Sequence, residues 1–326
     1  MDDSTNEISK ICNNALSAFD KIGIHTPAEV FHYTSPDGLL GITKEDSVKL
    51  FFTQYDSLND KNERIDVIES LVEYCTAKVK LNVISNELLN RVKNIKPSDL
   101  VSVTKEIKET TIRSDGVEIP TYVEMEYKDC YTYLCCFSQH PDSLSMWNYY
   151  SKSKHYEGYS LGIIRSHLSI PFYKSKEYTL ELKEVIYDKD YKFKMFEKYL
   201  LPIFIEYDKS SDQMKNFLLN IIISAIESVQ FIFKNSHFSH EEEVRAILRV
   251  SKEFVSDNLI SERKFRASNG YIVPYVELTL SKNDLRHIVT APLFEKDLAV
   301  KNLESMLKQK GFNNTKVVPS SIPIRF

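Results

Sequence analysis

Glycine is scarce in this chain, and its scarcity limits how the chain can bind a nucleotide. The 326 residues include 8 glycines, about a third of the roughly 7% share that is usual in proteins. They are spaced so that no G-x-G-x-x-G segment exists, and no glycine is followed by lysine. The dinucleotide-binding fingerprint and the P-loop both need such glycines, because the backbone must approach the phosphates closely. These two nucleotide-binding solutions are therefore excluded.

The composition is that of a globular protein with no general affinity for nucleic acid. Hydrophobic residues make up 42% of the chain and charged residues 27%, and the net charge is −4. This balance excludes wholesale disorder and a polycation built to bind phosphates. The five cysteines include the neighbours Cys135 and Cys136, an arrangement that favours a reducing compartment. The N-terminus does not resemble a signal peptide, and the apolar run 217–233 is interrupted by polar residues, so we expect a cytoplasmic protein without a membrane partner.

Hydrophobic periodicity predicts a mixed α+β fold with a split, mixed or antiparallel sheet. The segment Asp129–Ser138 is apolar on both faces, which is typical of a central buried strand. Further strands are predicted at residues 30–35, 47–55, 158–165, 181–187, 241–250, 271–280 and 286–291. Helices are predicted at residues 5–20, 39–42 and 296–310. We interpret residues 1–326 as a single domain with largely helical insertions at 60–128 and 191–235.

Two glutamates and an arginine alternate near residue 243. In a strand, the period of two places Glu241, Glu243 and Arg245 on one face. Like charges on one face repel each other, so a cation or a positively charged transition state opposite them would explain the pattern. The alternative is a solvated edge strand with an Arg–Glu pair. A helical arrangement would instead bring His237 near Glu241 and His240 near Glu243, which could suggest a metal site, but we predict no metal.

Other polar and aromatic residues are candidates for ligand contacts, each with a structural alternative. His32 lies in a predicted strand, with Thr34 on the same face, and either binds a ligand hydroxyl or is a core histidine bonded to a backbone carbonyl. Ser138 ends the central strand, where its hydroxyl is well placed for a ligand hydrogen bond. Trp147 and Tyr150 lie one turn apart on a predicted helix and form either a stacking platform or part of the core.

Acidic residues follow the second predicted strand directly. The segment Asn59-Asp60-x-x-Glu63 has the spacing of a helix N-cap with its partner three residues on. The same carboxylates could instead hold Mg²⁺ in a nuclease-like site.

Four lysines form a basic cluster, for which a solvated helix face is the favoured interpretation. They are Lys189, Lys192, Lys194 and Lys198.

Taken together, these segments resemble a bacterial family known mainly as a domain of unknown function. The resemblance extends from about residue 30 to the C-terminus, and the order of the segments is more specific than any one of them. The matching segments are His32-Tyr33-Thr34-Ser35, Asn59-Asp60-x-x-Glu63, Phe137-Ser138, Met146-Trp147-x-x-Tyr150, Gly158, Phe238-x-x-Glu241-x-Glu243-x-Arg245 and Ser321-Ile322-Pro323-Ile324-Arg325. That family in turn resembles, more distantly, ADP-ribosyltransferases of the His-Tyr-Glu and DarT-like kind.

The distant resemblance implies a role in NAD binding or cleavage for each matching residue. His32 corresponds to the histidine that binds the adenosine ribose in those enzymes. Glu243 or Glu241 corresponds to the catalytic glutamate, which holds the nicotinamide ribose. Ser138 and the Trp147–Tyr150 segment correspond to the segment that brackets the nicotinamide. Either Tyr150 or Tyr159 could correspond to the tyrosine of the family motif. The remaining candidate cofactor-binding residues are Thr34, Asn59, Asp60 and Arg245.

The resemblance therefore implies an enzyme that uses NAD as co-substrate and ADP-ribosylates a macromolecular acceptor, either protein or nucleic acid. Analogy with the DarT-like group adds a role as a toxin or phage-defence effector. One alternative is a non-catalytic nucleotide-sensing or interaction module on the same fold. Another is a metal-dependent nuclease that uses Asp60, Glu63, Glu241 and Glu243.

Overall fold

The structure is a computed structural model in which two compact units are described. The described residues are 3–24, 28–44, 46–58, 64–100, 103–105, 111–112, 118–119, 127–150, 157–169, 177–268, 270–292 and 295–323. Unit 1 comprises residues 1–25, 59–101 and 183–240, and unit 2 comprises residues 26–58, 102–182 and 241–326. The segments predicted as helical insertions contribute most of their described residues to unit 1.

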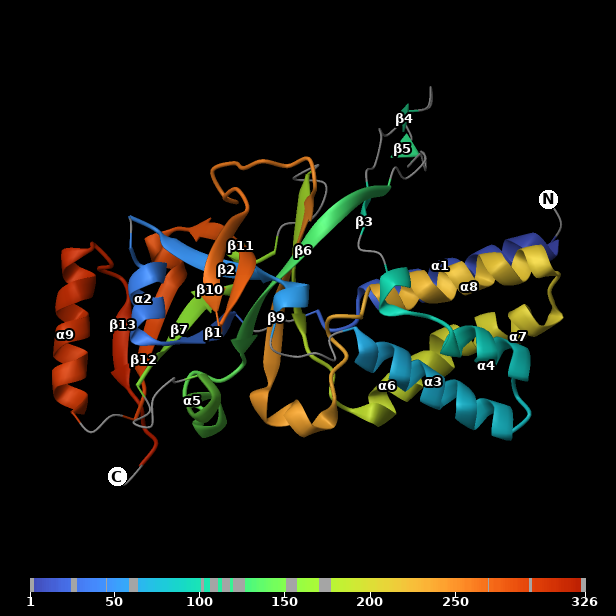
Figure 1. Ribbon diagram of the computed structural model, residues 1–326, viewed down its shortest axis with the longest axis horizontal. Helices are drawn as coiled ribbons and strands as arrows, with labels where there is room; N and C mark the ends of the chain where they lie inside the picture. Colours follow the sequence, from blue (N-terminus) through green and yellow to red (C-terminus); the bar gives the residue numbers. More distant parts are fainter. Residues whose placement is uncertain are drawn as a thin grey trace. The chain divides into compact units, whose positions relative to one another are not determined.

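Unit 1 is built mainly from helices (Figure 1). They are α1 (Asp3–Asp20), α3 (Ile65–Lys80), α4 (Asn86–Lys93), α6 (Lys189–Met195), α7 (Leu201–Lys209) and α8 (Asp212–Glu227). A π-helical turn, Phe196–Leu200, joins α6 to α7. Its first residue, Phe196, is fully buried, and its ring lies 6.3 Å from that of Phe19, 5.6 Å from that of Tyr74 and 6.0 Å from that of Phe233. This aromatic cluster joins helices that are far apart in sequence.

Unit 2 contains an open, mostly antiparallel sheet of eleven strands. The strand path is β10 (Lys264–Ser268), β11 (Tyr271–Leu280), β2 (Val48–Gln54), β6 (Tyr127–Ser138), β1 (Glu29–Thr34), β7 (Tyr159–Ile164), β12 (Leu285–Thr290) and β13 (Lys316–Pro319). Three more strands lie off this path: β3 (Val103–Lys105), β8 (Tyr178–Glu184) and β9 (Glu243–Ser251). A separate pair is formed by β4 (Thr111–Ile112) and β5 (Glu118–Ile119).

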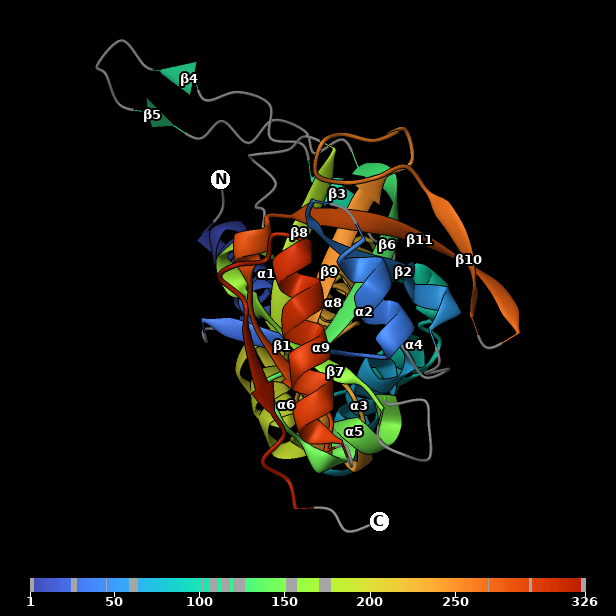
Figure 2. The ribbon, with the colours of Figure 1, turned by 90° about the vertical axis from the view of Figure 1, so that its left-hand side faces the viewer.

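Three helices pack against this sheet. They are α2 (Pro36–Ile42), α5 (Leu144–Tyr150) and α9 (Lys296–Gln309). Ser35 caps α2 by accepting a hydrogen bond from the Gly38 N–H, and Pro36 occupies the first helical position, where its missing N–H costs nothing. Helix α9 contacts β12 and β13, beside which it lies in Figure 1. In Figure 2 this red helix faces the viewer.

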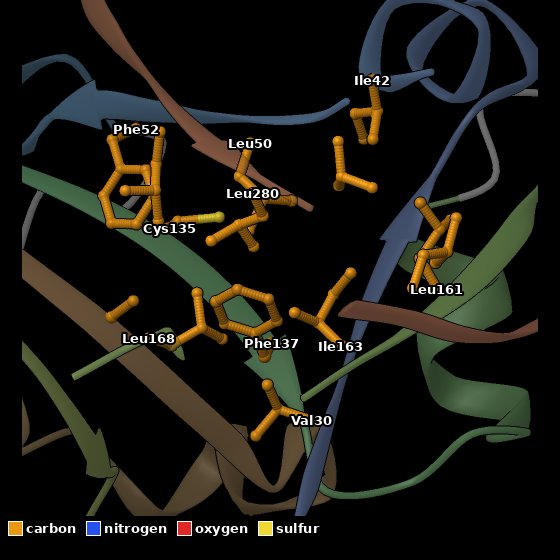
Figure 3. Packing of buried hydrophobic residues seen from close by; sticks show 14 of the residues in the cluster. Val30, Ile42, Leu50, Phe52, Cys135, Phe137, Leu161, Ile163, Leu168 and Leu280 are labelled. Carbon is orange, nitrogen blue, oxygen red and sulfur yellow. The ribbon is translucent and has the colours of Figure 1, made fainter. Parts of the chain in front are cut away.

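The core of unit 2 lies between the sheet and its helices. In Figure 3, Val30 from β1, Phe137 from β6 and Ile163 from β7 point toward one another. Leu50 and Phe52 of β2 extend the same cluster, and all five side chains are at most 1% exposed. Alternate residues along each strand are apolar and point into the core, so the period-two pattern of the sequence identifies the buried face of the sheet.

Most of the predicted elements are confirmed, with three corrections. The strand predicted at 241–250 begins at Glu243, because a 3-10 helix, Ser236–Glu241, precedes it. Strand β10 had no prediction. Lys192 was predicted on a solvated helix face, but its side chain is 4% exposed. The sequence also favours a hairpin or excursion around Asp115-Gly116, and these two residues lie outside the described part of the chain.

Candidate functional site

The site begins at a branch in the sheet of unit 2. Along one edge, strand β6 pairs with β9 over residues 130–138, from Cys130 opposite Ser251 to Ser138 opposite Glu243. Its first three residues, 127–129, pair with β3. Its other edge must therefore accommodate both β2, which pairs at residues 133–134, and β1, which pairs at Ser138 alone. Since β1 and β2 meet β6 at different points, the sheet opens between them beside residues 135–137.

His32 of β1 occupies this opening. Its Nδ1 lies 2.9 Å from the Cys136 backbone oxygen, so the ring supplies the hydrogen bond that a sheet ladder would otherwise make. Because a carbonyl only accepts, Nδ1 carries the proton, and Nε2 of the neutral ring is an acceptor. Burial lowers the pKa of His32, which keeps the ring neutral near pH 7.

A cavity of about 80 Å³ lies beside His32 and brings the predicted catalytic residues together. Its lining residues are His32, Tyr33, Cys136, Phe137, Met146, Tyr150, Glu241 and Glu243. Both predicted carboxylates, the predicted histidine and one of the two competing tyrosines thus face one cavity. Tyr150, at the end of α5, is the most exposed member of the lining, at 38%.

The carboxylates of this cavity are buried rather than solvated. Glu243 is 3% exposed, and Arg245 binds it through two hydrogen bonds, Nε to Oε1 at 2.8 Å and Nη2 to Oε2 at 3.1 Å. Glu241 is 8% exposed. Strand β9 lies between β6 and β8 and is buried on both faces, so the solvated edge strand proposed as the alternative is wrong, although its Arg–Glu pair is present. Two carboxylates and a neutral imidazole therefore line the cavity, and the Arg245 guanidinium binds one of the carboxylates from beside it.

The turn between the two glutamates fixes their direction. Glu242 has φ 42°, a left-handed conformation that is rare for residues other than glycine. Its carbonyl accepts a hydrogen bond from the Gln139 N–H (3.0 Å), and the Ser138 hydroxyl donates to the Glu241 carbonyl (3.1 Å). The end of β6 therefore holds the backbone that presents Glu241 and Glu243.

Ser138 and Trp147 support the site from behind rather than lining its cavity. Ser138 is fully buried and also accepts a hydrogen bond from the His140 N–H. The Trp147 indole is 1% exposed, donates to the Asp142 carboxylate at 2.8 Å and lies edge-on to the Tyr33 ring, with 4.7 Å between ring centres. The structure thus places both residues where they position α5 and the cavity wall.

The remaining predicted residues lie away from the cavity. Thr34 and Tyr159 are paired neighbours on β1 and β7, and neither lines the cavity. Burial raises the pKa of Tyr159, in keeping with its packing against the core. Asn59 and Asp60, like Glu63, lie outside the described residues.

Two residues of the site, Cys136 and Asp142, could not be identified from the sequence. Cys136 lines the cavity opposite Arg245 in the β6–β9 pairing, and burial together with the nearby Glu243 raises the pKa of its thiol well above the usual value. Asp142 binds the Trp147 indole and also accepts hydrogen bonds from Ser320 and Ser321. Only knowledge of the pairing register and of the path of the C-terminal segment could have revealed these contacts.

Comparison with known proteins yields one family match. A model for a protein family of unknown function, DUF2971, matches residues 146–246, a span that includes Tyr150, Glu241, Glu243 and Arg245. No curated protein matches the chain, and no solved structure matches it.

The described part of the chain contains neither a candidate membrane span nor a candidate metal-binding cluster. Its helices include none that is both long and apolar enough to cross a membrane. Nor do its histidine, cysteine and acidic side chains form a group of three or more that could hold a metal ion.

Proposed function

We propose that the chain is an ADP-ribosyltransferase-like enzyme that cleaves the bond between nicotinamide and ribose in NAD. The observation that carries the proposal is the convergence of His32, Glu241 and Glu243 on one cavity. The same proposal includes an ADP-ribosyltransferase-like fold with a split sheet. It also includes a macromolecular acceptor for the ADP-ribose and a role as a toxin or phage-defence effector.

The charge of the cavity suits the cationic end of this substrate. The nicotinamide ring of NAD is positively charged, and the oxocarbenium ion formed at the ribose also carries a positive charge. Carboxylates that line a buried cavity are suited to such cations, and a fixed carboxylate stabilises a charge that develops in the transition state more than it stabilises the ground state. Tyr150, Tyr33 and Phe137 add aromatic walls beside the carboxylates.

The size of the cavity limits which part of the substrate it holds. About 80 Å³ is enough for a few heavy atoms and not for a dinucleotide. We assign the reacting part of the ribose to it, with the rest of the substrate extending past the exposed Tyr150. His32 then offers Nε2 as an acceptor for a ribose hydroxyl.

The two glutamates take different roles in the proposed reaction. When the C1′–N bond breaks, its electron pair leaves with nicotinamide, and the ribose becomes an oxocarbenium ion beside Glu243. A nucleophile, either water or a group of the acceptor, then forms a new bond to C1′ and gives its proton to Glu241. Arg245 fixes the Glu243 carboxylate in place during this sequence.

One observation favours a second candidate, a non-catalytic module that binds a nucleotide. Arg245 neutralises Glu243 through both of its carboxylate oxygens, which weakens the field that Glu243 exerts on a developing cation. A protein that only senses the ligand would tolerate this neutralisation. The two candidates therefore differ in turnover and not in binding.

A calorimetric titration with NAD, run beside a chromatographic assay for free nicotinamide, separates the candidates. The enzyme predicts binding and nicotinamide release, with release reduced by about 10²-fold or more in Glu241→Gln when an acceptor must be deprotonated. Binding without release would favour the sensing module. Neither binding nor release, from a protein shown to be folded by circular dichroism, would contradict both candidates.

A further inference from the structure

A second candidate site lies entirely within unit 1, around Lys192 of α6. The Lys192 side chain is 4% exposed, whereas its neighbour Lys194 on the same helix is exposed. Its Nζ donates a hydrogen bond to the Lys234 carbonyl at 2.7 Å and lies 5.2 Å from the centre of the Phe233 ring. An ammonium group has three N–H donors, and Lys234 provides the one acceptor that the described residues place within hydrogen-bond distance.

Lys192 lines a cavity of about 160 Å³. Asp66, Glu69 and Glu73 contribute to its wall from α3, and Lys189 contributes from α6. Asp66 is 9% exposed and accepts a hydrogen bond from the Asn235 N–H at 3.1 Å, so a fixed buried carboxylate faces the same space as the amine. A cavity of about 150 Å³ can hold a molecule the size of benzene, which sets the size of a ligand at about six heavy atoms.

The surroundings of Lys192 favour a reactive amine. Burial lowers its pKa to about 8, although the negative charges of Asp66 and Asp188 act in the opposite direction. Roughly a quarter of the amines would then be neutral at pH 7.5, against about a thousandth for an ordinary lysine. A neutral, desolvated lysine amine is the usual nucleophile in Schiff-base chemistry.

We propose that Lys192 forms a protonated Schiff base with a short aldehyde or ketone bound in the cavity between α3 and α6. The neutral amine attacks the carbonyl carbon to give a carbinolamine, which takes up a proton and loses its oxygen as water. Glu69 lies in the same cavity and can carry that proton, whereas the Glu73 carboxylate is bound by Lys189. The product is an iminium ion, in which the nitrogen has formed a double bond to carbon.

The charge balance of the cavity favours this adduct over other lysine modifications. An iminium ion keeps the positive charge that faces Asp66 and the Phe233 ring. An amide would remove that charge and a carbamate would invert it, in a cavity that is also lined by Asp66, Glu69 and Glu73. The chemistry that the site tolerates is therefore addition to a carbonyl compound rather than acyl transfer.

Reductive trapping tests the proposal on the full chain. The protein is incubated with propanal and cyanoborohydride at pH 7, and the alkylated lysines are identified by peptide mass spectrometry. We expect Lys192 to be labelled at least about 10-fold faster than Lys194. Its labelling rate should rise with a midpoint near pH 8, because burial lowers the pKa of the amine against the opposing charges of Asp66 and Asp188. The other charged residues near the amine are Glu69, Glu73, Lys189 and Lys234.

Two variants control the experiment. Lys194→Met should leave the labelling of Lys192 unchanged, and Lys192→Met should remove the fast-labelled peptide. Labelling of Lys192 at the rate of Lys194, or labelling only after unfolding in urea, would overturn the proposal, since the amine would then be an inert donor to the Lys234 carbonyl.

Discussion

At the scale of single residues, His32 combines a structural and a functional role that the sequence offered as alternatives. Its Nδ1–H satisfies the Cys136 carbonyl where the ladder of β6 is interrupted, as a core histidine would. Its ring also lines the cavity that contains Glu241 and Glu243. Spacing along the strand could not distinguish these roles, because both follow from where β1 leaves β6.

The lowered pKa of His32 has a consequence for stability. Because burial lowers the pKa of the folded state below the unfolded value of about 6.5, the unfolded chain binds more protons as the pH falls below that value. His32 should therefore destabilise the fold progressively from about pH 7 to pH 5. Urea titrations should show a smaller loss over this interval for His32→Gln than for the wild type. The exposed His237→Gln is the control, and an equal loss in His32→Gln would show that the His32 ring is accessible to protons.

Glu243 and Arg245 form a buried ion pair, in which each charge compensates the burial of the other. Both are buried, so Arg245→Met would leave a carboxylate in the interior without its guanidinium. We expect a loss of about 3–5 kcal/mol in the free energy of unfolding, and a smaller loss when Glu243→Gln is added, because the double variant buries no unpaired charge. Urea unfolding of both variants measures the difference. A double variant less stable than Arg245→Met alone would contradict this account of the pair.

At the scale of elements, the site depends on how β6 ends. The sequence predicted a central strand over Asp129–Ser138, and β6 has that place. The branch between β1 and β2 was not predictable in position, because strand register depends on pairings between residues about a hundred positions apart. The same holds for Glu241, which period-two spacing placed in β9 and which instead ends a 3-10 helix.

The C-terminal segment is joined to α5 by Asp142. Its carboxylate accepts hydrogen bonds from the Trp147 indole, from Ser320 and from Ser321. Burial acts to raise the pKa of Asp142, but these hydrogen bonds outweigh it and leave the pKa below the ordinary value. Their contribution should be present above about pH 4 and be lost as the pH falls below it.

Asp142→Asn should therefore lower the free energy of unfolding by about 1–3 kcal/mol at pH 7. The difference from the wild type should shrink as the pH falls from about 4 through the lowered pKa of the native Asp142 carboxyl. Thermal unfolding at pH 7 and at a pH below 4 measures the difference, and Asp37→Asn, at an exposed position of α2, is the control. A difference that does not change with pH would mean that the carboxylate charge is unimportant.

The turn at Glu242 makes a prediction about backbone conformation. With φ 42°, the position suits glycine, tolerates glutamate at some cost and is least compatible with a β-branched residue. Glu242→Val should be less stable than Glu242→Gly by about 1–3 kcal/mol. Both variants lose the His140–Glu242 contact equally, so their difference, measured by urea unfolding, reports the backbone alone. Equal stability would show that the turn relaxes to an ordinary conformation.

At the scale of the whole molecule, each of the two units contains one of the two candidate sites. The carboxylate cavity is lined only by residues of unit 2, and the Lys192 cavity only by residues of unit 1. Apolar periodicity was sufficient to predict most strands and helices of both units, because it records which faces are buried. Apolar periodicity did not predict the burial of Lys192. A lysine among other charged residues of a helix looks solvent-exposed in the sequence, and its burial follows only from the packing of α3 against α6.

The central claim is that Glu243 stabilises the positive charge formed when NAD is cleaved, and its most direct test is the rate of nicotinamide release by Glu243→Gln. The account predicts a loss of about 10²–10³-fold relative to the wild type, with the exposed Glu262→Gln unchanged. The double variant Glu243→Gln, Arg245→Met, which buries no unpaired charge, guards against loss of the fold and should be equally impaired. If the wild type releases nicotinamide and a folded Glu243 variant does so at the same rate, Glu243 has no part in the chemistry.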